Sequence, residues 1–130
     1  KKEVIDDLIQ GAYNDRPKML RGFGDIFFFQ HTTEAFSDWF FKLGLQAAGW
    51  ATAQTSNAWF EPVTDDLEKI SVPTLILHGI HDNVCPFPLA LAQKKAIKNS
   101  KLVPFEFSGH GVFYDQKDEF NKELMRFIES

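Results

Sequence analysis

The sequence predicts an α/β fold, with a helical region at residues 1–62 followed at residues 63–130 by two parallel strands and their helices. Three observations support this prediction. Apolar residues recur at helical spacing before the Glu61-Pro62 pair. Two short apolar runs come after that pair, and each leads into a helical segment. Strands that alternate with helices form a parallel sheet.

The region at residues 1–62 is expected to contain four helices. Apolar spacing predicts a first helix that ends at Gly11 and a second over residues 16–23. Residues 32–34 and Ser37 offer N-cap candidates for a third helix, because hydroxyl and carboxylate oxygens can accept the unpaired backbone N–H groups there. Residues 51–59 form the fourth. The region is therefore predicted to be a helical layer.

Aromatic residues are concentrated in this helical region. Eleven of the nineteen in the chain lie between Phe23 and Phe60, an excess that needs an explanation. One explanation is that they form the core of the layer, since large apolar side chains are usually buried. The other is that some of them line an apolar substrate pocket beneath a lid. The candidates for this pocket are Phe28, Trp39, Phe40 and Trp59.

The region at residues 63–130 begins with a short capped helix at residues 64–68. The apolar run at residues 74–78, bounded by Pro73 and Gly79, is typical of a buried parallel strand. A helix at residues 89–99 and a second strand at residues 102–107 follow. The last helix begins near Asp115, and helical spacing gives it one apolar face formed by Phe120, Leu124, Phe127 and Ile128.

Two strands are too few to cover the apolar faces of the helices beside them. We therefore expect either that the rest of the sheet lies in an N-terminal segment absent from this chain, or that the chain forms a homo-oligomer. The chain starts Lys1-Lys2-Glu3 without an initiator methionine, which favours a fragment.

The residues with the clearest chemical meaning are Asp82 and His110, each of which follows one of the two strands. Open α/β sheets bind ligands beyond the carboxyl ends of their strands, so the two loops should be neighbours. An aspartate that accepts the Nδ1 proton of a histidine fixes the ring tautomer and stabilises the imidazolium that forms when Nε2 takes a proton. Glycines on both sides of His110 would allow a tight turn. Asp82 and His110 are therefore the predicted catalytic residues.

Other candidates near this pair have simpler explanations. His78 and His81 lack the partners of a metal site and are interpreted as strand-end and loop residues, so no metal is expected. Cys85 follows the aspartate loop and has no activating motif of its own, so it is not expected to be a nucleophile. A single aspartate or histidine in a loop is more often a turn or solvated residue, and it is the pairing of two strand-end loops that indicates a site.

Along its whole length the chain resembles the aryl esterases and cofactor-free perhydrolases, or non-haem chloroperoxidases, of the α/β-hydrolase fold family. The resemblance rests on Asp15-Arg16, Phe28-Phe29 and residues 37–40 of a lid, on residues 64–75, on His78-Gly79 with Asp82 and Pro86, and on His110-Gly111 and residues 120–124. It implies the C-terminal part of a serine hydrolase acting on aryl or small acyl esters, with peracid formation when peroxide replaces water. It also implies that Asp82 and His110 are triad partners and that no cofactor is used.

The chain departs from this family in lacking the G-x-S-x-G motif of the nucleophile. Its serines all lie outside such a motif: Ser37, Ser56, Ser71, Ser100, Ser108 and Ser130. We therefore expect no nucleophile in this chain, and we expect the missing N-terminal half of the fold to be its partner. Two alternatives stay open: a relative with an aspartate nucleophile, such as a dehalogenase or epoxide hydrolase, and a catalytically inactive structural or interaction module.

Composition excludes several classes of partner. The net charge is −4 and the 14 basic residues are spread along the chain, so nucleic acid and anionic membranes are not expected partners. The 44% apolar share is that of a globular protein. The single cysteine and the lack of a signal peptide or long apolar run favour a cytoplasmic location. The resemblance to the esterase group implies a small-molecule ester as ligand.

Overall fold

The structure is a computed structural model that describes residues 2–61 and 64–130, and these residues form two compact units. The first unit comprises residues 2–25 and 32–61, and the second comprises residues 26–31 and 64–130. The segment 26–31 thus packs with the strands, although it lies inside the region predicted to be one helical layer. The predicted boundary at residues 62 and 63 lies outside the described residues. The assignment of residues 1–62 as a lid stays a prediction.

The first unit is built from four helices. They are α1 (Lys2–Asn14), α2 (Arg16–Phe27), α3 (Glu34–Leu45) and α4 (Gly49–Ala58), and the last two residues of α2 belong to the second unit. The prediction that the first helix ends at Gly11 was wrong. Gly11 lies inside α1. The close approach of Met19 explains why this position is a glycine, because a Cβ here would be 3.0 Å from the Cβ of Met19.

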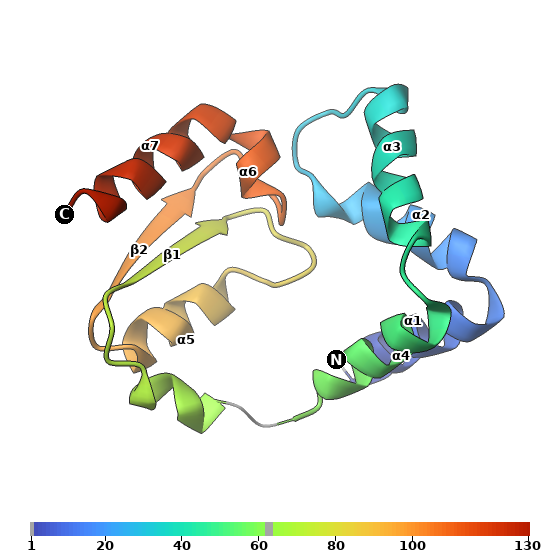
Figure 1. Ribbon diagram of the computed structural model, residues 1–130, viewed down its shortest axis with the longest axis horizontal. Coiled ribbons are helices and arrows are strands. Elements are labelled where there is room, and N and C mark those ends of the chain that lie inside the picture. Colours follow the sequence, from blue (N-terminus) through green and yellow to red (C-terminus); the bar gives the residue numbers. More distant parts are fainter. Residues whose placement is uncertain (1, 62–63) are drawn as a thin grey trace. The chain divides into compact units, whose positions relative to one another are not determined.

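The core of the first unit lies between α1 and α4, which pack side by side (Figure 1). Ile9 and Ala12 of α1 are buried against Ala53 of α4, with Ile5 and Met19 partly buried around them. Small residues at this contact allow the two helix backbones to approach closely. The third helix begins as predicted, because the hydroxyl oxygen of Thr33 accepts the backbone N–H of Phe36 at 3.2 Å.

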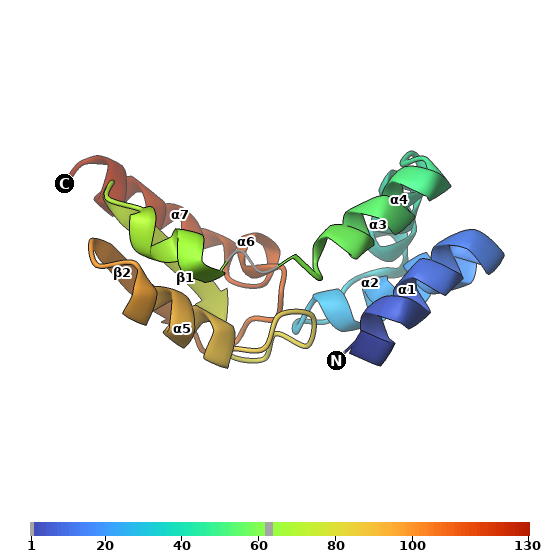
Figure 2. The same ribbon diagram turned by 90° about the horizontal axis from the view of Figure 1, so that it is seen from below.

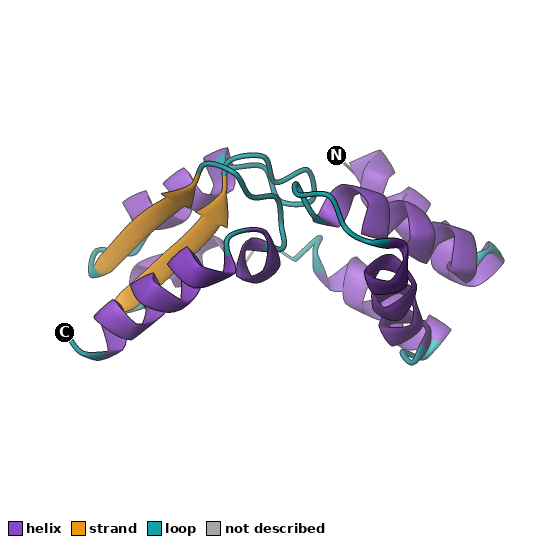
Figure 3. Ribbon diagram, turned by 90° about the horizontal axis from the view of Figure 1, so that it is seen from above, coloured by secondary structure: helices purple, strands orange, loops and turns teal. Residues whose placement is uncertain are grey.

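The second unit contains the only strands among the described residues (Figure 3). Its elements are the 3₁₀ helix η1 (Thr64–Lys69), β1 (Thr74–Gly79), α5 (Pro88–Ala96), β2 (Ser100–Phe105), α6 (Val112–Asp115) and α7 (Lys117–Ile128). The strands are parallel, with Thr74 opposite Ser100 and Gly79 opposite Phe105. The predicted pair of parallel strands is therefore confirmed, although β2 ends two residues earlier than expected.

Helices α5 and α7 cover opposite faces of this two-stranded sheet (Figures 2 and 3). Ile76 and Phe105 of the strands are buried, as are Ala90 of α5 and Val112 of α6. Ile128, predicted to complete the apolar face of α7, is 66% exposed at the end of the helix.

Glu123 is buried in the middle of α7 instead, where it accepts a hydrogen bond from Lys101 of β2. No helix in residues 2–61 or 64–130 is long and apolar enough to cross a membrane.

Candidate active site

Two loops meet where β1 and β2 end. The first follows β1 and contains Asp82, and the second follows β2 and contains His110. The backbone N–H of His81 donates to the carbonyl oxygen of Ser108 at 3.0 Å, which joins the loops directly. Gly79 lies against the second loop so closely that a Cβ there would collide with the carbonyl oxygens of Ser108 and Gly109. The parallel register of the strands therefore brings the two loops into contact.

The carboxylate of Asp82 is almost completely buried, with only 3% of the side chain exposed. Its Oδ1 accepts the backbone N–H groups of Val84 and Cys85, each at 2.8 Å. Its Oδ2 lies 2.8 Å from Nδ1 of His110. Hydrogen bonds to a charged carboxylate are the strong ones, and they compensate for removing this charge from water. The loop thus fixes one carboxylate oxygen and directs the other at the imidazole.

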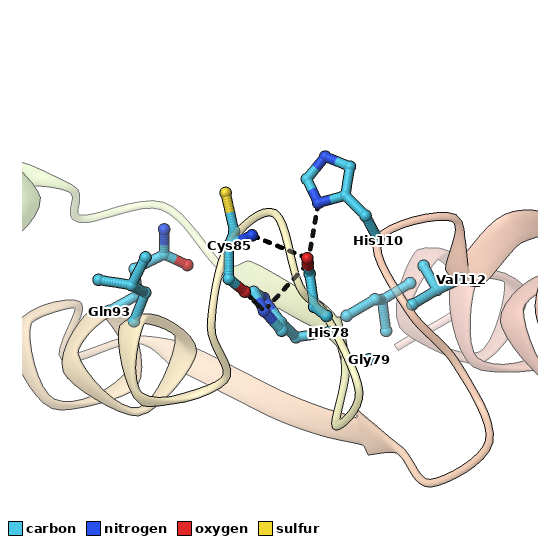
Figure 4. Close-up of a pocket in the computed structure, with 9 residues that line it drawn as sticks. His78, Gly79, Cys85, Gln93, His110 and Val112 are labelled. Carbon is cyan, nitrogen blue, oxygen red and sulfur yellow. Dashed lines mark hydrogen bonds and ion pairs between the residues drawn. The ribbon is translucent and has the colours of Figure 1, made fainter. Parts of the chain in front are cut away.

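The contact with Asp82 determines which nitrogen of His110 is available for chemistry. An ionised carboxylate can only accept, so Nδ1 carries the shared hydrogen and Nε2 of the neutral ring is left as an acceptor. Figure 4 shows one ring nitrogen of His110 at the end of a hydrogen bond and the other on the far side of the ring. About a third of the His110 side chain is exposed. The geometry is that of a general base supported by an acid.

His78 is a second imidazole near the same carboxylate. Its Nε2 lies 2.7 Å from the carbonyl oxygen of Cys85 and 3.4 Å from Oδ2 of Asp82. A carbonyl oxygen can only accept, so Nε2–H of His78 donates to it and holds the loop closed. His81 stacks on the ring of Phe29 with centroids 4.2 Å apart. Both histidines therefore have structural partners, and His78 lies in β1 itself.

Cys85 is poorly suited to act as a nucleophile. Burial raises the pKa of its thiol above the ordinary value, and the negative charge of Asp82 raises it further. Nucleophilic cysteines need the opposite environment, in which a nearby positive charge favours the thiolate. Among the described residues, no group of three or more His, Cys, Asp or Glu side chains is arranged to hold a metal ion.

A cavity of about 200 Å³ adjoins the pair of loops in the second unit (Figure 4). Polar side chains from both loops and apolar ones from the sheet and helices line it: Leu77, His78, Gly79, Asp82, Cys85, Leu89, Gln93, His110 and Val112. None of the four aromatic residues predicted for a substrate pocket is among them. Asp82 and His110 thus line the same cavity as the apolar side chains of the sheet and helices.

The four predicted pocket aromatics lie in both units. Phe28 belongs to the second unit and packs against Tyr114, with ring centroids 5.0 Å apart. Trp39 and Phe40 lie on α3, and Trp59 caps the end of α4. Trp39 is 53% exposed and Trp59 is 52% exposed. Their role in a substrate pocket stays a prediction.

One aromatic residue that contacts the base is Phe27, which the sequence pattern did not single out. Its ring meets the ring of His110 edge-on with centroids 4.7 Å apart. The run Phe27-Phe28-Phe29 was conspicuous in the sequence, but nothing in a run of three identical residues indicates which of them faces a histidine 81 to 83 positions later.

The glycines beside His110 were predicted to allow a tight turn, and the structure gives a further reason for them. No glycine among the described residues has a positive φ, so none is needed for a left-handed turn. Their value lies in close packing. A Cβ on Gly109 would lie 3.0 Å from the carbonyl oxygen of Phe27, and one on Gly111 would collide with the ring of Phe28.

The serine hydroxyls that have hydrogen bonds in the structure are engaged away from His110. Ser56 donates to the carbonyl oxygen of Thr52, Ser108 to the side chain of Gln116, and Ser100 to the carbonyl oxygen of Ile97. Ser37 pairs with Thr32, and Ser130 donates to the carbonyl oxygen of Phe127. None of these contacts resembles the bond between a nucleophile and its base.

Comparisons with known proteins agree on one type of fold. The model of the Abhydrolase_4 family, described as TAP-like protein, matches residues 34–130. The AB hydrolase superfamily protein YisY of Bacillus subtilis is 40% identical over 131 residues, which cover 100% of this chain and 49% of that protein. Two solved structures are also similar. An esterase from Exiguobacterium antarcticum is 41% identical with a TM-score of 0.96, covering 100% of this chain and 49% of that one.

The second solved structure is a bromoperoxidase from Bacillus anthracis. It is 29% identical with a TM-score of 0.90, and the match covers 97% of this chain and 48% of that one. The chain therefore spans about half the length of the relatives it matches, and the half that it matches is the C-terminal one.

Proposed function

This chain belongs to the Abhydrolase_4 family of α/β-hydrolases, and from that premise we propose that the whole protein hydrolyses carboxylic esters through a covalent acyl-enzyme. Asp82 is the acid of its catalytic triad and His110 is the base. The observation that carries the proposal is the 2.8 Å contact between Oδ2 of Asp82 and Nδ1 of His110, formed by a buried carboxylate and a partly exposed imidazole.

In the first half of the reaction, Nε2 of His110 removes the proton of a serine hydroxyl as its oxygen attacks the ester carbonyl carbon. The carbonyl electrons move to oxygen and then return, breaking the bond to the alcohol, which leaves with the proton from His110. In the second half, water attacks the acyl carbon and gives a proton to the same nitrogen. The bond between the acyl carbon and the serine oxygen then breaks, the carboxylic acid leaves, and His110 returns the proton to the serine oxygen. Asp82 stabilises the imidazolium in both halves.

The serine and the oxyanion hole come from the half of the protein that precedes this chain. In this fold the triad residues follow the order Ser, Asp, His, and the serine lies in a G-x-S-x-G turn. Two features support this division. The chain corresponds to 49% of YisY, and β1 has a strand neighbour on one edge only within the described residues. That N-terminal half is thus the proposed partner of this chain.

The proposed substrate class is a small carboxylic ester, with an aryl or small acyl group. The similarity to an esterase supports hydrolysis, and the similarity to a bromoperoxidase supports a second outcome. In that outcome, hydrogen peroxide replaces water in the second half-reaction, and its oxygen attacks the acyl carbon to release a peracid. The same acid and base serve both outcomes, and no cofactor takes part in either.

The first test uses this chain alone and p-nitrophenyl acetate as the ester. We expect the chain to release p-nitrophenol no faster than its His110→Ala variant, because the nucleophile is not in it. Turnover that depends on His110 would show that another residue of this chain attacks the ester, and would overturn the proposed division of the triad. The exposed His31→Ala variant controls for attack on the ester by any imidazole.

The second test uses the whole protein. His110→Ala should lower kcat/KM by a factor on the order of 10⁴ or more, since a triad without its base loses most of its rate enhancement. His31→Ala should leave kcat/KM unchanged. A whole protein that hydrolyses no carboxylic ester, or one whose activity survives loss of His110, would overturn the proposed function. An aspartate in place of the serine in the turn would instead support a dehalogenase or epoxide hydrolase.

A further inference from the structure

Asp115 binds backbone groups from two distant segments of the chain. Its Oδ2 accepts the N–H groups of Phe29 at 3.0 Å and Gly109 at 2.8 Å, and its Oδ1 accepts the N–H of Gln30 at 2.9 Å. Phe29 and Gln30 belong to the segment 26–31, and Gly109 immediately precedes His110. One carboxylate at the end of α6 therefore joins this segment to the loop that carries the base.

The peptide group on the other side of His110 is held by the same segment. The N–H of Gly111 donates to the carbonyl oxygen of Phe27 at 3.1 Å. The ring of Phe27 then meets the His110 imidazole edge-on, with centroids 4.7 Å apart. The backbone before His110 is thus fixed by Asp115 directly, and the backbone after it is fixed through a segment that Asp115 holds.

Gln116, the next residue after Asp115, adds to this arrangement. Its Oε1 accepts the N–H of Phe107 at 2.8 Å and the hydroxyl of Ser108 at 3.0 Å. The side chain of Gln30 donates to the carbonyl oxygen of Phe107 at 3.0 Å. The three residues before His110 are therefore bonded to side chains from α6, from the residue after it, and from the segment 26–31.

We propose that Asp115 is a positioning residue that keeps the His110 imidazole directed at Asp82 by binding the peptide groups of Gly109 and of the segment 26–31. Its importance for catalysis rests on the proposed function. The hydrogen bonds of Asp115 go to backbone N–H groups, and Asp115 is not among the residues that line the cavity beside His110, so it acts through the backbone. Its charge matters because three N–H donors converge on it, and bonds from N–H to a carboxylate are stronger than bonds to a neutral oxygen.

The variant Asp115→Asn has nearly the same shape and tests this role. The new NH₂ group cannot accept, so at least one of the three N–H groups loses its acceptor. In the 130-residue chain, hydrogen exchange at the amides of Phe29, Gln30 and Gly109 should become about 10- to 100-fold faster. Exchange in β1 and β2 should not change. The control Asp118→Asn, at an exposed position on α7, should change none of these rates.

A spectroscopic measurement separates positioning from a merely structural role. In the original chain, the Nδ1 proton of His110 should give a strongly downfield resonance because it is bonded to a buried carboxylate. Asp115→Asn should shift or broaden that resonance, and Asp118→Asn should not. An unchanged His110 resonance, together with faster exchange at the three amides, would overturn the proposal.

The original chain also provides a test that needs no variant, should Asp115→Asn fail to fold. The amides of Phe29, Gln30 and Gly109 share one acceptor group, so they should become exchangeable together with one common protection factor. Protection at Gly109 alone, with Phe29 and Gln30 exchanging as in a free peptide, would overturn the proposal.

In the whole protein, Asp115→Asn should lower kcat by about 10- to 100-fold with little change in KM, because a small displacement of the base affects the chemical steps more than ester binding. A rise in KM with unchanged kcat would overturn the positioning role. Failure of the original whole protein to hydrolyse any ester would overturn only the proposed function, because the resonance and exchange measurements on the 130-residue chain do not depend on activity.

Discussion

At the scale of single residues, the site depends on how a buried charge is compensated. Asp82 has two backbone N–H donors on one oxygen and an imidazole on the other, so its charge is favourable only while the loop after β1 keeps its shape. The same loop is closed by the bond from His78 to the carbonyl oxygen of Cys85. The acid is therefore held by its own loop, whereas the base is held by more distant residues.

Gly79 lies where the two loops pack most closely, so adding a single methyl group at this position should destabilise the fold. Its added Cβ would meet backbone atoms of Ser108 and Gly109, which cannot move aside as a flexible side chain can. We expect Gly79→Ala to lower the free energy of unfolding by about 1–3 kcal/mol, the range for overpacking. Urea unfolding followed by circular dichroism measures this change.

The matched control for Gly79 is Gly22 on α2, where an added Cβ meets nothing within 4 Å. Gly22→Ala should raise the free energy of unfolding by about 0.5–1 kcal/mol, since alanine is the better helix former. Equal effects of the two substitutions would contradict the explanation by close packing.

Asp82 and His110 could be predicted because the order of strand, helix and strand in the sequence indicates a parallel pair. Parallel strands end at the same edge of a sheet, so the residues that follow them must be neighbours. The sequence did not predict the contacts of Asp115, since Phe29 and Gln30 lie about 85 positions earlier and join the second unit through a loop with no periodicity. Phe27 was missed because a run of three phenylalanines does not show which ring will face His110. The catalytic roles of Asp82 and His110 stay predictions.

At the scale of elements, α7 is attached to the sheet by a buried carboxylate. Oε2 of Glu123 lies 2.8 Å from Nζ of Lys101 on β2, and Arg126 of the same helix bonds to Oε1. The hydrogen bond from Lys101 lowers the pKa of Glu123 below its ordinary value, and the one from Arg126 lowers it further. The buried Glu123 thus adds a charged contact to a helix for which the spacing predicted an apolar face.

The lowered pKa of Glu123 predicts how stability depends on pH. A carboxyl whose pKa is lower in the folded state stabilises the fold above its unfolded pKa of about 4.3, and the contribution disappears as the pH falls through the folded value. Glu123→Gln should therefore lower the urea midpoint at pH 7, and the difference from the original chain should vanish in strong acid. Glu119→Gln, on the exposed side of α7, is the control and should have little effect at either pH. A difference that persists in acid would contradict this account.

Local pattern predicted the type of each element better than its ends. Family membership, predicted from the two strand-end loops and the lid motifs, is confirmed by the family match over residues 34–130. Gly11 was wrongly predicted to end a helix, since glycine often does so. The glycine instead makes room for Met19, a contact that the sequence does not reveal. Tertiary contacts of this kind influence where helices end, and they cannot be predicted from the spacing of apolar residues along the sequence.

At the scale of the whole molecule, the second unit has an unfinished sheet. Within the described residues, β1 pairs with β2 on one edge and has no strand on the other. Large apolar side chains are exposed on the helices and loops around it, including Leu89 at 46%, Phe107 at 54% and Met125 at 51%. An open edge combined with exposed apolar surface favours pairing with another chain. In the whole protein, the proposed N-terminal half would occupy that edge.

In the 130-residue chain alone, we expect a second copy to take the place of the absent half. Sedimentation velocity should show oligomers whose share rises with protein concentration, and they should persist in 0.5 M salt because apolar contacts are not screened as charge contacts are. Adding the N-terminal half of the whole protein should convert these oligomers into a complex of the two halves, because its strand competes for the same edge. A monodisperse monomer at all concentrations would contradict this expectation, and oligomers that disappear in salt would show that charges, rather than the open edge, hold the copies together.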